Sequence, residues 1–243
     1  MPSVLTLDLG NTSLKGVLWE GGRVLQRFRW MRKGRALVGG GELALERGVR
    51  VLGLASRGLS LEHGISGCPP GEWVGREIPP PLRVEYEDPG EMGWDRRVAA
   101  YALHRLEGEG LVLDAGTCLT LTHVDREGNC RGFGIAPGLG ALAGGLRGAA
   151  PDLARDLPPN WDGYPSRTGC TRENLQAGLW AAFVGAAREL LAMGRERLER
   201  AGLSPGALFL TGSDGELLAP PLGEGRVEPL LIHRGLLLLG GEL

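Results

Sequence analysis

The sequence predicts an α/β protein with two related halves. An apolar strand that ends in Asp-x-Gly, followed by Thr and a second alternating strand, occurs twice, at residues 4–19 and 110–122. In each half this hairpin is followed by stretches in which apolar residues recur at helical spacing. The repetition of one pattern indicates two domains of related structure, residues 1–108 and 109–243.

The first half is expected to consist mainly of strands. Short apolar or alternating runs predict strands at residues 4–7, 14–19, 24–30, 49–55 and 83–86. A short helix is expected at residues 42–47, and the Gly- and Pro-rich stretch 64–81 is expected to form a loop. A helix is predicted over residues 95–106 by the spacing of Val98, Ala99, Ala102, Leu103 and Leu106.

The second half begins with the repeated hairpin and continues into helices. A strand is predicted at residues 129–135, followed by a helical stretch from Pro137 to about Ala154. The longest helix is predicted at residues 174–201, with Thr171 and Asn174 in capping positions. Its apolar face is expected to contain Leu175, Leu179, Ala182, Ala186, Leu190 and Met193. A buried strand and a terminal apolar helix complete this half, at residues 207–211 and 230–239.

The composition indicates a soluble globular protein of the cytoplasm. Of 243 residues, 42% are hydrophobic and 23% are charged, which is ordinary for such proteins. The net charge of −2 gives no general electrostatic reason to expect nucleic acid binding. The four cysteines lack the C-x-x-C spacing of zinc sites, so reduced thiols are expected. No apolar run approaches the roughly 18 residues that would indicate a membrane span, and no signal peptide precedes the first strand.

The two hairpin tips carry the residue types that bind nucleotide phosphates. Each tip combines a carboxylate, a glycine and a hydroxyl: Asp8, Gly10 and Thr12 in the first, Asp114, Gly116 and Thr117 in the second. Glycine permits a tight turn that brings backbone N–H groups close to a ligand. N–H groups and hydroxyls suit phosphate oxygens, and carboxylates suit a hard cation. Two such tips suggest two half-domains that clamp one nucleotide, although each tip taken alone is compatible with a plain turn.

Five motifs, in this order, resemble the type III pantothenate kinases. They are Asp8-Leu9-Gly10-Asn11-Thr12, Gly93-Trp94-Asp95-Arg96, Asp114-Ala115-Gly116-Thr117, Gly134-Ile135-Ala136-Pro137-Gly138-Leu139 and Thr211-Gly212-Ser213. The resemblance implies the acetate and sugar kinase/Hsp70/actin superfamily, with two RNase H-like (actin-like ATPase) domains, each a mixed β-sheet with flanking helices. It also implies ATP-dependent phosphorylation of pantothenate to 4′-phosphopantothenate, the first step of coenzyme A biosynthesis. The implied enzyme is a homodimer that uses Mg²⁺ and a monovalent cation, K⁺ or NH₄⁺.

The resemblance assigns the nucleotide and the cations to the two tips and the adenosine-side motif. The expected ATP-binding residues are Asp8, Gly10, Asn11, Thr12, Lys15, Gly116, Thr117, Thr211 and Gly212. Asp8 is expected to face the magnesium–phosphate complex, and Asp114 to bind the monovalent cation. Because Mg²⁺ keeps several waters and takes few protein carboxylates, one Asp at a loop tip is chemically sufficient. For Lys15, a solvated strand position is equally compatible with the sequence.

Asp95 is expected to be the general base, because a carboxylate within reach of a primary hydroxyl can accept its proton. The expected substrate-binding residues are Tyr86, Gly93, Trp94, Arg96 and Thr171. The Arg96 guanidinium suits the carboxylate of pantothenate, and Thr171 is expected to reach pantothenate from the partner subunit. Each assignment has a structural alternative: a helix cap for Asp95 and Thr171, a surface arginine for Arg96, and a core aromatic for Tyr86.

Two other functions stay open at this point. One is a kinase of the same superfamily that acts on another small hydroxylated substrate. The other is a regulatory protein, since relatives of the family have been described as accessory factors for virulence-gene transcription (Bvg accessory factor). The presence of Asp8, Asp95 and Asp114 together favours catalysis, because a purely regulatory protein would not require all three.

Overall fold

The computed structural model describes residues 3–33, 36–38, 48–56, 70–158, 164–165 and 167–243. By contacts between residues, the chain divides into two compact units. Unit 1 comprises residues 1–106, 128–130 and 230–243, and unit 2 comprises residues 107–127 and 131–229. The C-terminal helix therefore belongs to the same unit as the N-terminal strands. The proposed domain boundary at residues 108/109 stays a prediction, and the short helix expected at residues 42–47 lies outside the described residues.

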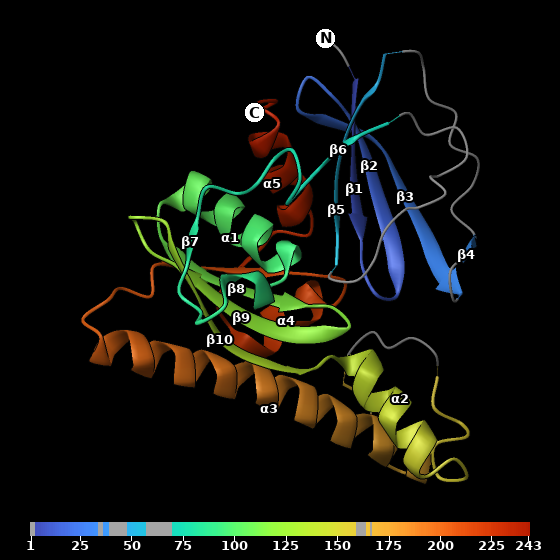
Figure 1. Ribbon diagram of the computed structural model, residues 1–243. Coiled ribbons are helices and arrows are strands. Elements are labelled where there is room, and N and C mark those ends of the chain that lie inside the picture. Colours follow the sequence, from blue (N-terminus) through green and yellow to red (C-terminus); the bar gives the residue numbers. More distant parts are fainter. Residues whose placement is uncertain (1–2, 34–35, 39–47, 57–69, 159–163, 166) are drawn as a thin grey trace. The chain divides into compact units, whose positions relative to one another are not determined.

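Unit 1 is built on a six-stranded mixed sheet (Figure 1). Its strands are β1 (Ser3–Leu9), β2 (Ser13–Glu20), β3 (Arg23–Lys33), β4 (Ala36–Val38), β5 (Arg50–Ala55) and β6 (Glu72–Trp73), in the spatial order β4-β3-β2-β1-β5-β6. Strands β1 and β2 form the predicted antiparallel hairpin, and β5 runs parallel to β1. The two-residue β6 lies within the stretch expected to be a loop.

Alternating side chains along β1 and β2 face two separate cores, one on each face of the sheet. One core contains Leu5, Leu7, Leu9, Leu14, Phe28, Trp30, Val49 and Val51. The other joins strand residues to the helices α1 (Trp94–Glu107) and α5 (Leu231–Leu239), and it contains Val4, Val17, Trp19, Leu52, Leu54, Val74, Val98, Leu236 and Leu237. By alternation, Thr6 and Asp8 lie on the helix-covered face.

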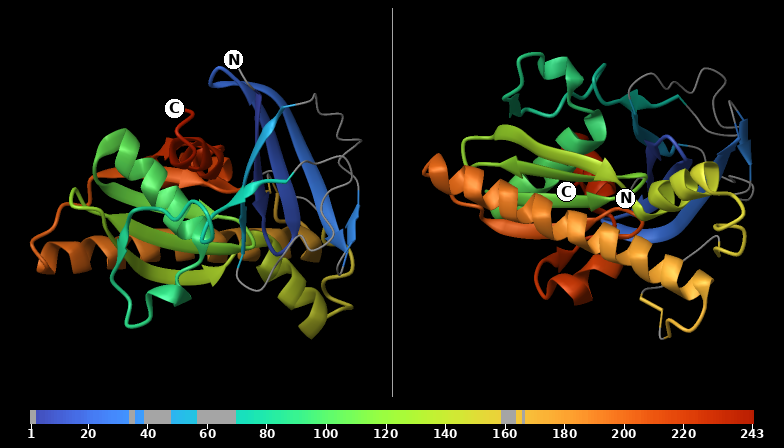
Figure 2. Two further views of the ribbon diagram at one scale, coloured as in Figure 1. Left: turned by 45° about the horizontal axis from the view of Figure 1, so that its top comes forward. Right: turned by 90° about the horizontal axis from the view of Figure 1, so that it is seen from below.

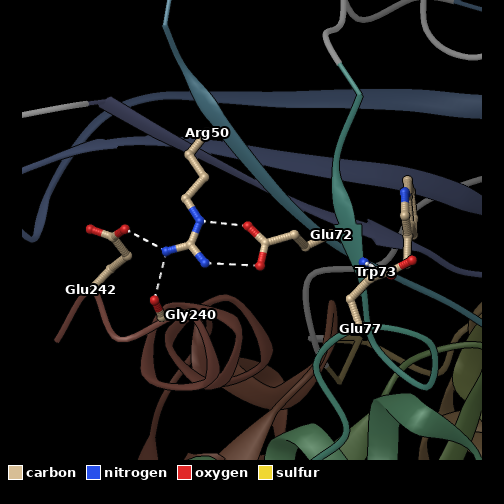
Figure 3. Close-up of polar contacts among 6 residues, drawn as sticks. All are labelled: Arg50, Glu72, Trp73, Glu77, Gly240 and Glu242. Atoms are coloured by element: carbon tan, nitrogen blue, oxygen red, sulfur yellow. Dashed lines mark hydrogen bonds and ion pairs between the residues drawn. The ribbon is translucent and has the colours of Figure 1, made fainter.

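Arg50 on β5 holds the C-terminal end of α5 against the sheet (Figure 3). Its guanidinium makes a bidentate ion pair with Glu72 of β6, at 2.7 and 2.9 Å. Its Nη1 donates to the carbonyl of Gly240 at 2.6 Å and to Glu242 at 2.8 Å. These contacts raise the pKa of Arg50 and lower that of Glu72. One side chain therefore connects β5, β6 and the end of the last helix.

Unit 2 repeats the strand order of unit 1. Its strands are β8 (Gly110–Ala115), β9 (Cys118–Val124), β10 (Asn129–Pro137), β11 (Ala207–Thr211) and β12 (Arg226–Val227), in the order β12-β11-β8-β9-β10. The order β3-β2-β1-β5 thus recurs as β10-β9-β8-β11, with an antiparallel hairpin and a parallel neighbour in both sheets. The fold class predicted from the sequence is confirmed. Within unit 1, the short β7 (Arg83–Val84) pairs with residues 129–130 at the start of β10.

One long helix covers a face of the unit 2 sheet (Figures 1 and 2). This helix, α3 (Thr171–Arg200), contacts α2 (Leu139–Ala149), α4 (Gly215–Leu222) and β9. Its buried residues are Trp180, Phe183, Val184, Ala187, Leu191, Gly194 and Leu198. The predicted apolar face is correct in part: Leu179, Ala186 and Leu190 are half-buried and pack against this core, Leu175 and Met193 are half-buried, and Ala182 is exposed. Apolar residues cover a wide arc of α3. The part of this arc that carries the large rings of Trp180 and Phe183 is buried.

The structure differs from the sequence-based prediction in the end of one helix, α2, and in the presence of another, α4. Helix α2 ends at Ala149, earlier than expected, and residues 151–156 form turns. Helix α4, which contains Pro220 and Pro221, was not predicted from the sequence. Both prolines lie in the last turn of this helix, where each lacks the N–H that would donate to the carbonyl four residues earlier. Among the described residues, no helix is long and apolar enough to cross a membrane.

Candidate functional site

The first hairpin tip, residues 9–13, is a tight turn at one end of the unit 1 sheet. The Gly10 N–H donates to the carbonyl of Ser13 at 3.0 Å, which closes the turn. Asn11 and Thr12 are exposed, whereas Ser13 and the strands on either side are buried. The tip therefore presents the backbone and side chains of Asn11 and Thr12 at the surface of the unit. This is the arrangement that a phosphate-binding loop requires.

Asp8 is a buried carboxylate beside a lysine. It lies opposite Lys15 in the register of β1 and β2, so the two side chains share one face of the sheet. Burial raises the pKa of Asp8 to about 6, a shift that the positive charge of Lys15 opposes and the negative charge of Asp95 reinforces. A buried carboxylate held in this way gains from a nearby cation, because a cation favours its ionised form. These surroundings fit the expected contact with a metal–phosphate complex.

Asp95 is the second residue of α1 and not its cap residue. Its Oδ1 accepts the N–H of Arg96 at 2.9 Å, and it lies in the space that a side chain on Gly93 would fill. The carboxylate is half-exposed, and it lies close enough to Asp8 for its charge to act on that residue's pKa. Unit 1 therefore brings together the predicted base and the first tip's carboxylate.

Arg96 is buried, with 7% of its surface exposed, so it is not a surface arginine. Its Nη1 donates to the hydroxyl of Tyr86 at 3.1 Å. Tyr86 is half-buried and reaches this contact from the segment that precedes α1. The two residues predicted to bind substrate are thus hydrogen-bonded to each other, next in sequence to the predicted base.

Trp94 helps to fix the start of α1. The Gly75 main chain, at φ +86°, lies so close to the indole that a methyl group on residue 75 would overlap it. The Arg97 guanidinium lies 4.4 Å from the centre of the indole ring. Trp94 also packs against the core that includes Val98. These contacts give Trp94 a structural task within unit 1, and its assignment as a substrate contact stays a prediction.

The second hairpin tip is enclosed by two glycines of unit 2. Its turn is closed by the Gly116 N–H, which donates to the carbonyl of Cys118 at 3.0 Å. The Gly138 N–H donates to the carbonyl of Thr117 at 3.0 Å, and a methyl group on Gly138 would overlap the Gly116 carbonyl. A methyl group on Gly212, at φ +87°, would overlap Asp114 Oδ1 and the Ala115 carbonyl. Three of the five sequence motifs therefore meet within this unit.

Two threonines differ from their expected environments. The Thr211 hydroxyl is buried and donates to the carbonyl of Glu228 at 2.8 Å, so the exposed part of its motif is Gly212-Ser213.

Thr171 is the first residue of α3. It is not the cap residue, which is Cys170 and makes no side-chain hydrogen bond. Instead, Glu173 accepts the N–H of Gly169 at 2.8 Å, and Asn174 donates to the carbonyl of Cys170 at 3.1 Å. The Thr171 side chain is exposed.

Within the described parts of the chain, no group of three or more His, Cys, Asp or Glu residues could hold a metal ion by itself. Asp8 and Asp114 each fit a cation that takes its other ligands from phosphate or water. The described cysteines, Cys118, Cys130 and Cys170, form no disulfide with one another.

Residues 64–193, more than half of the chain, match the family model of the type III pantothenate kinases. A relative described as a type III pantothenate kinase, from Alkalilimnicola ehrlichii, is 33% identical over 257 aligned positions, covering 100% of this chain and 99% of the relative. This chain belongs to the type III pantothenate kinase family.

Other members of the type III pantothenate kinase family match over part of their length. A type III pantothenate kinase of Synechococcus sp. (strain JA-3-3Ab) is 36% identical over 168 residues, which is 64% of this chain and 63% of that protein. A second Synechococcus sp. protein of the same description is 38% identical, and the match spans 61% of its length. These two matches cover less than two thirds of the relatives concerned.

Solved structures support the fold of this family member. A Campylobacter jejuni protein, described as a Baf family transcriptional activator, has a TM-score of 0.58 at 17% identity and 98% coverage of both chains. A Chromobacterium violaceum protein, described as an N-acetylglucosamine kinase, has a TM-score of 0.52 at 13% identity, covering 98% of this chain and 99% of that one. At such low identity, the likeness concerns the fold alone.

Proposed function

We propose that this protein transfers a phosphoryl group from ATP to pantothenate, giving 4′-phosphopantothenate in the first step of coenzyme A biosynthesis. One observation carries the proposal. Unit 1 places the Asp8 carboxylate within electrostatic range of Asp95, and the next residue, Arg96, is buried and hydrogen-bonded to Tyr86. A phosphate loop, a base and a carboxylate-binding pair are the parts that such a kinase needs.

The first tip serves the triphosphate. Gly10 forms the turn that presents the tip, the backbone N–H groups of Asn11 and Thr12 bind phosphate oxygens, and the Lys15 ammonium offsets the phosphate charge. Asp8 holds Mg²⁺ through a carboxylate that burial makes sensitive to a cation. When bound, Mg²⁺ neutralises charge on the β- and γ-phosphates. The protein supplies position and charge, which are the main requirements of phosphoryl transfer.

Asp95 acts as the general base. The 4′ hydroxyl oxygen of pantothenate forms a bond to the γ-phosphorus while the bond from that phosphorus to the bridging oxygen of ADP breaks. Asp95 accepts the hydroxyl proton as the new bond forms. Asp95 lies in the first turn of α1, two residues after Gly93.

Arg96, with Tyr86, binds the carboxylate of pantothenate. The guanidinium is buried and its orientation is restrained by the hydrogen bond to Tyr86. A buried guanidinium binds a carboxylate with charge-assisted hydrogen bonds in a geometry that an ammonium cannot reproduce. Gly93 and Trp94 shape the same segment by making room for Asp95 and by fixing the start of α1.

The remaining assignments concern residues of unit 2. Gly116 and Thr117 bind phosphate, Asp114 binds the monovalent cation (K⁺ or NH₄⁺), and the Thr211-Gly212 backbone serves the adenosine side. The exposed Thr171 reaches pantothenate in the partner subunit of a homodimer. The exposure of Thr171 and the enclosed second tip support these roles.

A direct assay separates this proposal from its alternatives. The purified protein is incubated with ATP, Mg²⁺, K⁺ or NH₄⁺, and pantothenate, and 4′-phosphopantothenate is sought by mass spectrometry. Formation of the product supports the proposal. Absence of product with ATP still bound would indicate a kinase for another small hydroxylated substrate. Absence of both product and ATP binding would reject the kinase and favour the regulatory alternative.

The homodimer has its own test. Activity per protomer is measured during serial dilution, with the oligomeric state followed by analytical ultracentrifugation. If Thr171 serves the partner's site, activity falls as the dimer dissociates, and Thr171→Ala loses pantothenate affinity while Thr168→Ala, also exposed, does not. A fully active monomer would contradict this part of the proposal.

A further inference from the structure

Arg32 lies near the end of β3, twenty positions after Thr12 of the first tip. Its Nη1 donates to the carbonyl of Asn11 at 3.0 Å and, more weakly, to that of Gly10 at 3.5 Å. Its main-chain N–H donates to the carbonyl of Thr12 at 2.9 Å. One residue therefore contacts the carbonyl oxygens of three consecutive tip residues.

These contacts fix the direction of the tip's amide groups. Among the described residues no peptide bond is cis, and in a trans peptide the C=O and the following N–H point in opposite directions. With the Gly10 and Asn11 carbonyls directed at Arg32, the N–H groups of Asn11 and Thr12 are directed away from it. The Gly10 N–H is already used to close the turn on Ser13.

The charge of Arg32 adds to this effect. A guanidinium that donates to a carbonyl polarises the peptide group, so the N–H at the other end of that group becomes a stronger donor. The positive charge also raises the potential around a loop that is expected to meet phosphate. Both effects favour binding of the phosphate part of a nucleotide and have no bearing on adenosine or pantothenate.

We propose that Arg32 is a positioning residue of the first phosphate loop, which orients the Asn11 and Thr12 amides toward the phosphates of ATP. This inference rests on the proposed function for its ligand and on the structure for its geometry. No sequence motif contains Arg32, because its contact with the tip arises only from the pairing of β2 with β3.

Four proteins test the proposal: wild type, Arg32→Met, Arg32→Lys and the control Arg23→Met. Methionine keeps an apolar stem but removes the donors and the charge, and Arg23 is an exposed arginine at the other end of the same strand. Hydrogen exchange of residues 10–13 is measured without nucleotide. The KM values for ATP and pantothenate are measured in parallel.

In Arg32→Met we expect faster exchange at the tip and a KM for ATP raised by about tenfold or more, with the KM for pantothenate unchanged. Arg32→Lys should recover part of the ATP affinity, since an ammonium can donate to one carbonyl, and Arg23→Met should resemble wild type. Unchanged exchange at residues 10–13 in Arg32→Met would overturn the positioning role, whatever the KM values. If the wild type bound no ATP, the proposed function would fail, and the exchange measurement would still decide whether Arg32 orders the tip.

Discussion

The carboxylate of Asp95 lies against the α-carbon of Gly93, in the space that a methyl group on residue 93 would occupy. Asp95 Oδ1 also accepts the N–H of Arg96 at 2.9 Å. The position of the Asp95 carboxylate therefore depends on Gly93, which must lack a side chain, and on the N–H of Arg96. This relationship gives a physical reason for the glycine two positions before the aspartate.

Replacing Gly93 with alanine should lower kcat without unfolding the protein. The added methyl group would meet the end of a flexible side chain, so Asp95 can rotate away and the fold needs no other adjustment. The expected result is a large loss of turnover with an unchanged Tm. Gly148→Ala, where the methyl group meets nothing within 4 Å, is the matched control. Full turnover in Gly93→Ala would show that the observed orientation of Asp95 is not needed.

Replacing Asp8 with asparagine should stabilise the protein while abolishing ATP-dependent activity. Burial raises the pKa of Asp8 to about 6, above its value in the unfolded chain, so the ionised form at pH 7 costs folding free energy. Removing this charge should raise the free energy of unfolding at pH 7 by about 1–3 kcal/mol. Urea denaturation in the presence of a metal chelator measures this change. A decrease in stability would contradict the environment described for Asp8, and the exposed Asp152→Asn is the control.

Replacing Tyr86 with phenylalanine should raise the KM for pantothenate several-fold and leave the KM for ATP unchanged. The substitution removes the hydroxyl that accepts from Arg96 Nη1 at 3.1 Å, so the guanidinium loses a restraint on its orientation. Arg96→Ala should have the larger effect on the same constant. Tyr101→Phe is a matched control, because it removes a Tyr–Arg hydrogen bond of 2.9 Å on α1. Equal effects on both KM values would argue against the carboxylate-binding role.

Stability should fall with acidification because of His233 on α5. Its Nδ1 lies 2.9 Å from the Thr6 hydroxyl, and burial, followed by the charges of Lys15 and Arg27, lowers its pKa to about 3. The folded-state pKa lies below the unfolded value of 6.5, so the stability contributed by neutral His233 is present above pH 6.5 and lost as the pH falls toward 3. Unfolding free energies at a series of pH values should decline less steeply in His233→Gln than in wild type or His104→Gln. Identical slopes in all three would refute the assignment.

Local patterns predicted most of the strands and the long helices. The hairpins around Asp8 and Asp114 follow from alternating residues and a glycine turn, and α1 follows from its apolar spacing. The strands β4, β6 and β12 have only two or three residues each. Strands this short carry no periodicity and form only because a neighbouring strand offers a partner.

The contacts that position the site were less accessible from the sequence. Arg32 meets the first tip through strand pairing, and Gly138 meets the second tip through a close backbone approach. The Thr211 hydroxyl is used inside unit 2 by the carbonyl of Glu228, seventeen positions away. Such contacts join residues that are distant in the chain, so no local pattern records them. Packing within each unit determines which atoms of the motif residues are exposed, as the buried Thr211 hydroxyl shows.

Asp95 is proposed to be the base in phosphoryl transfer to pantothenate. The most direct test compares wild type and Asp95→Asn for the rate of 4′-phosphopantothenate formation, with the ATP dissociation constant measured in both. We expect product formation by the wild type, a loss of rate of about 10²-fold or more in Asp95→Asn, and closely similar ATP affinity in the two proteins. Wild-type turnover in Asp95→Asn would contradict the claim.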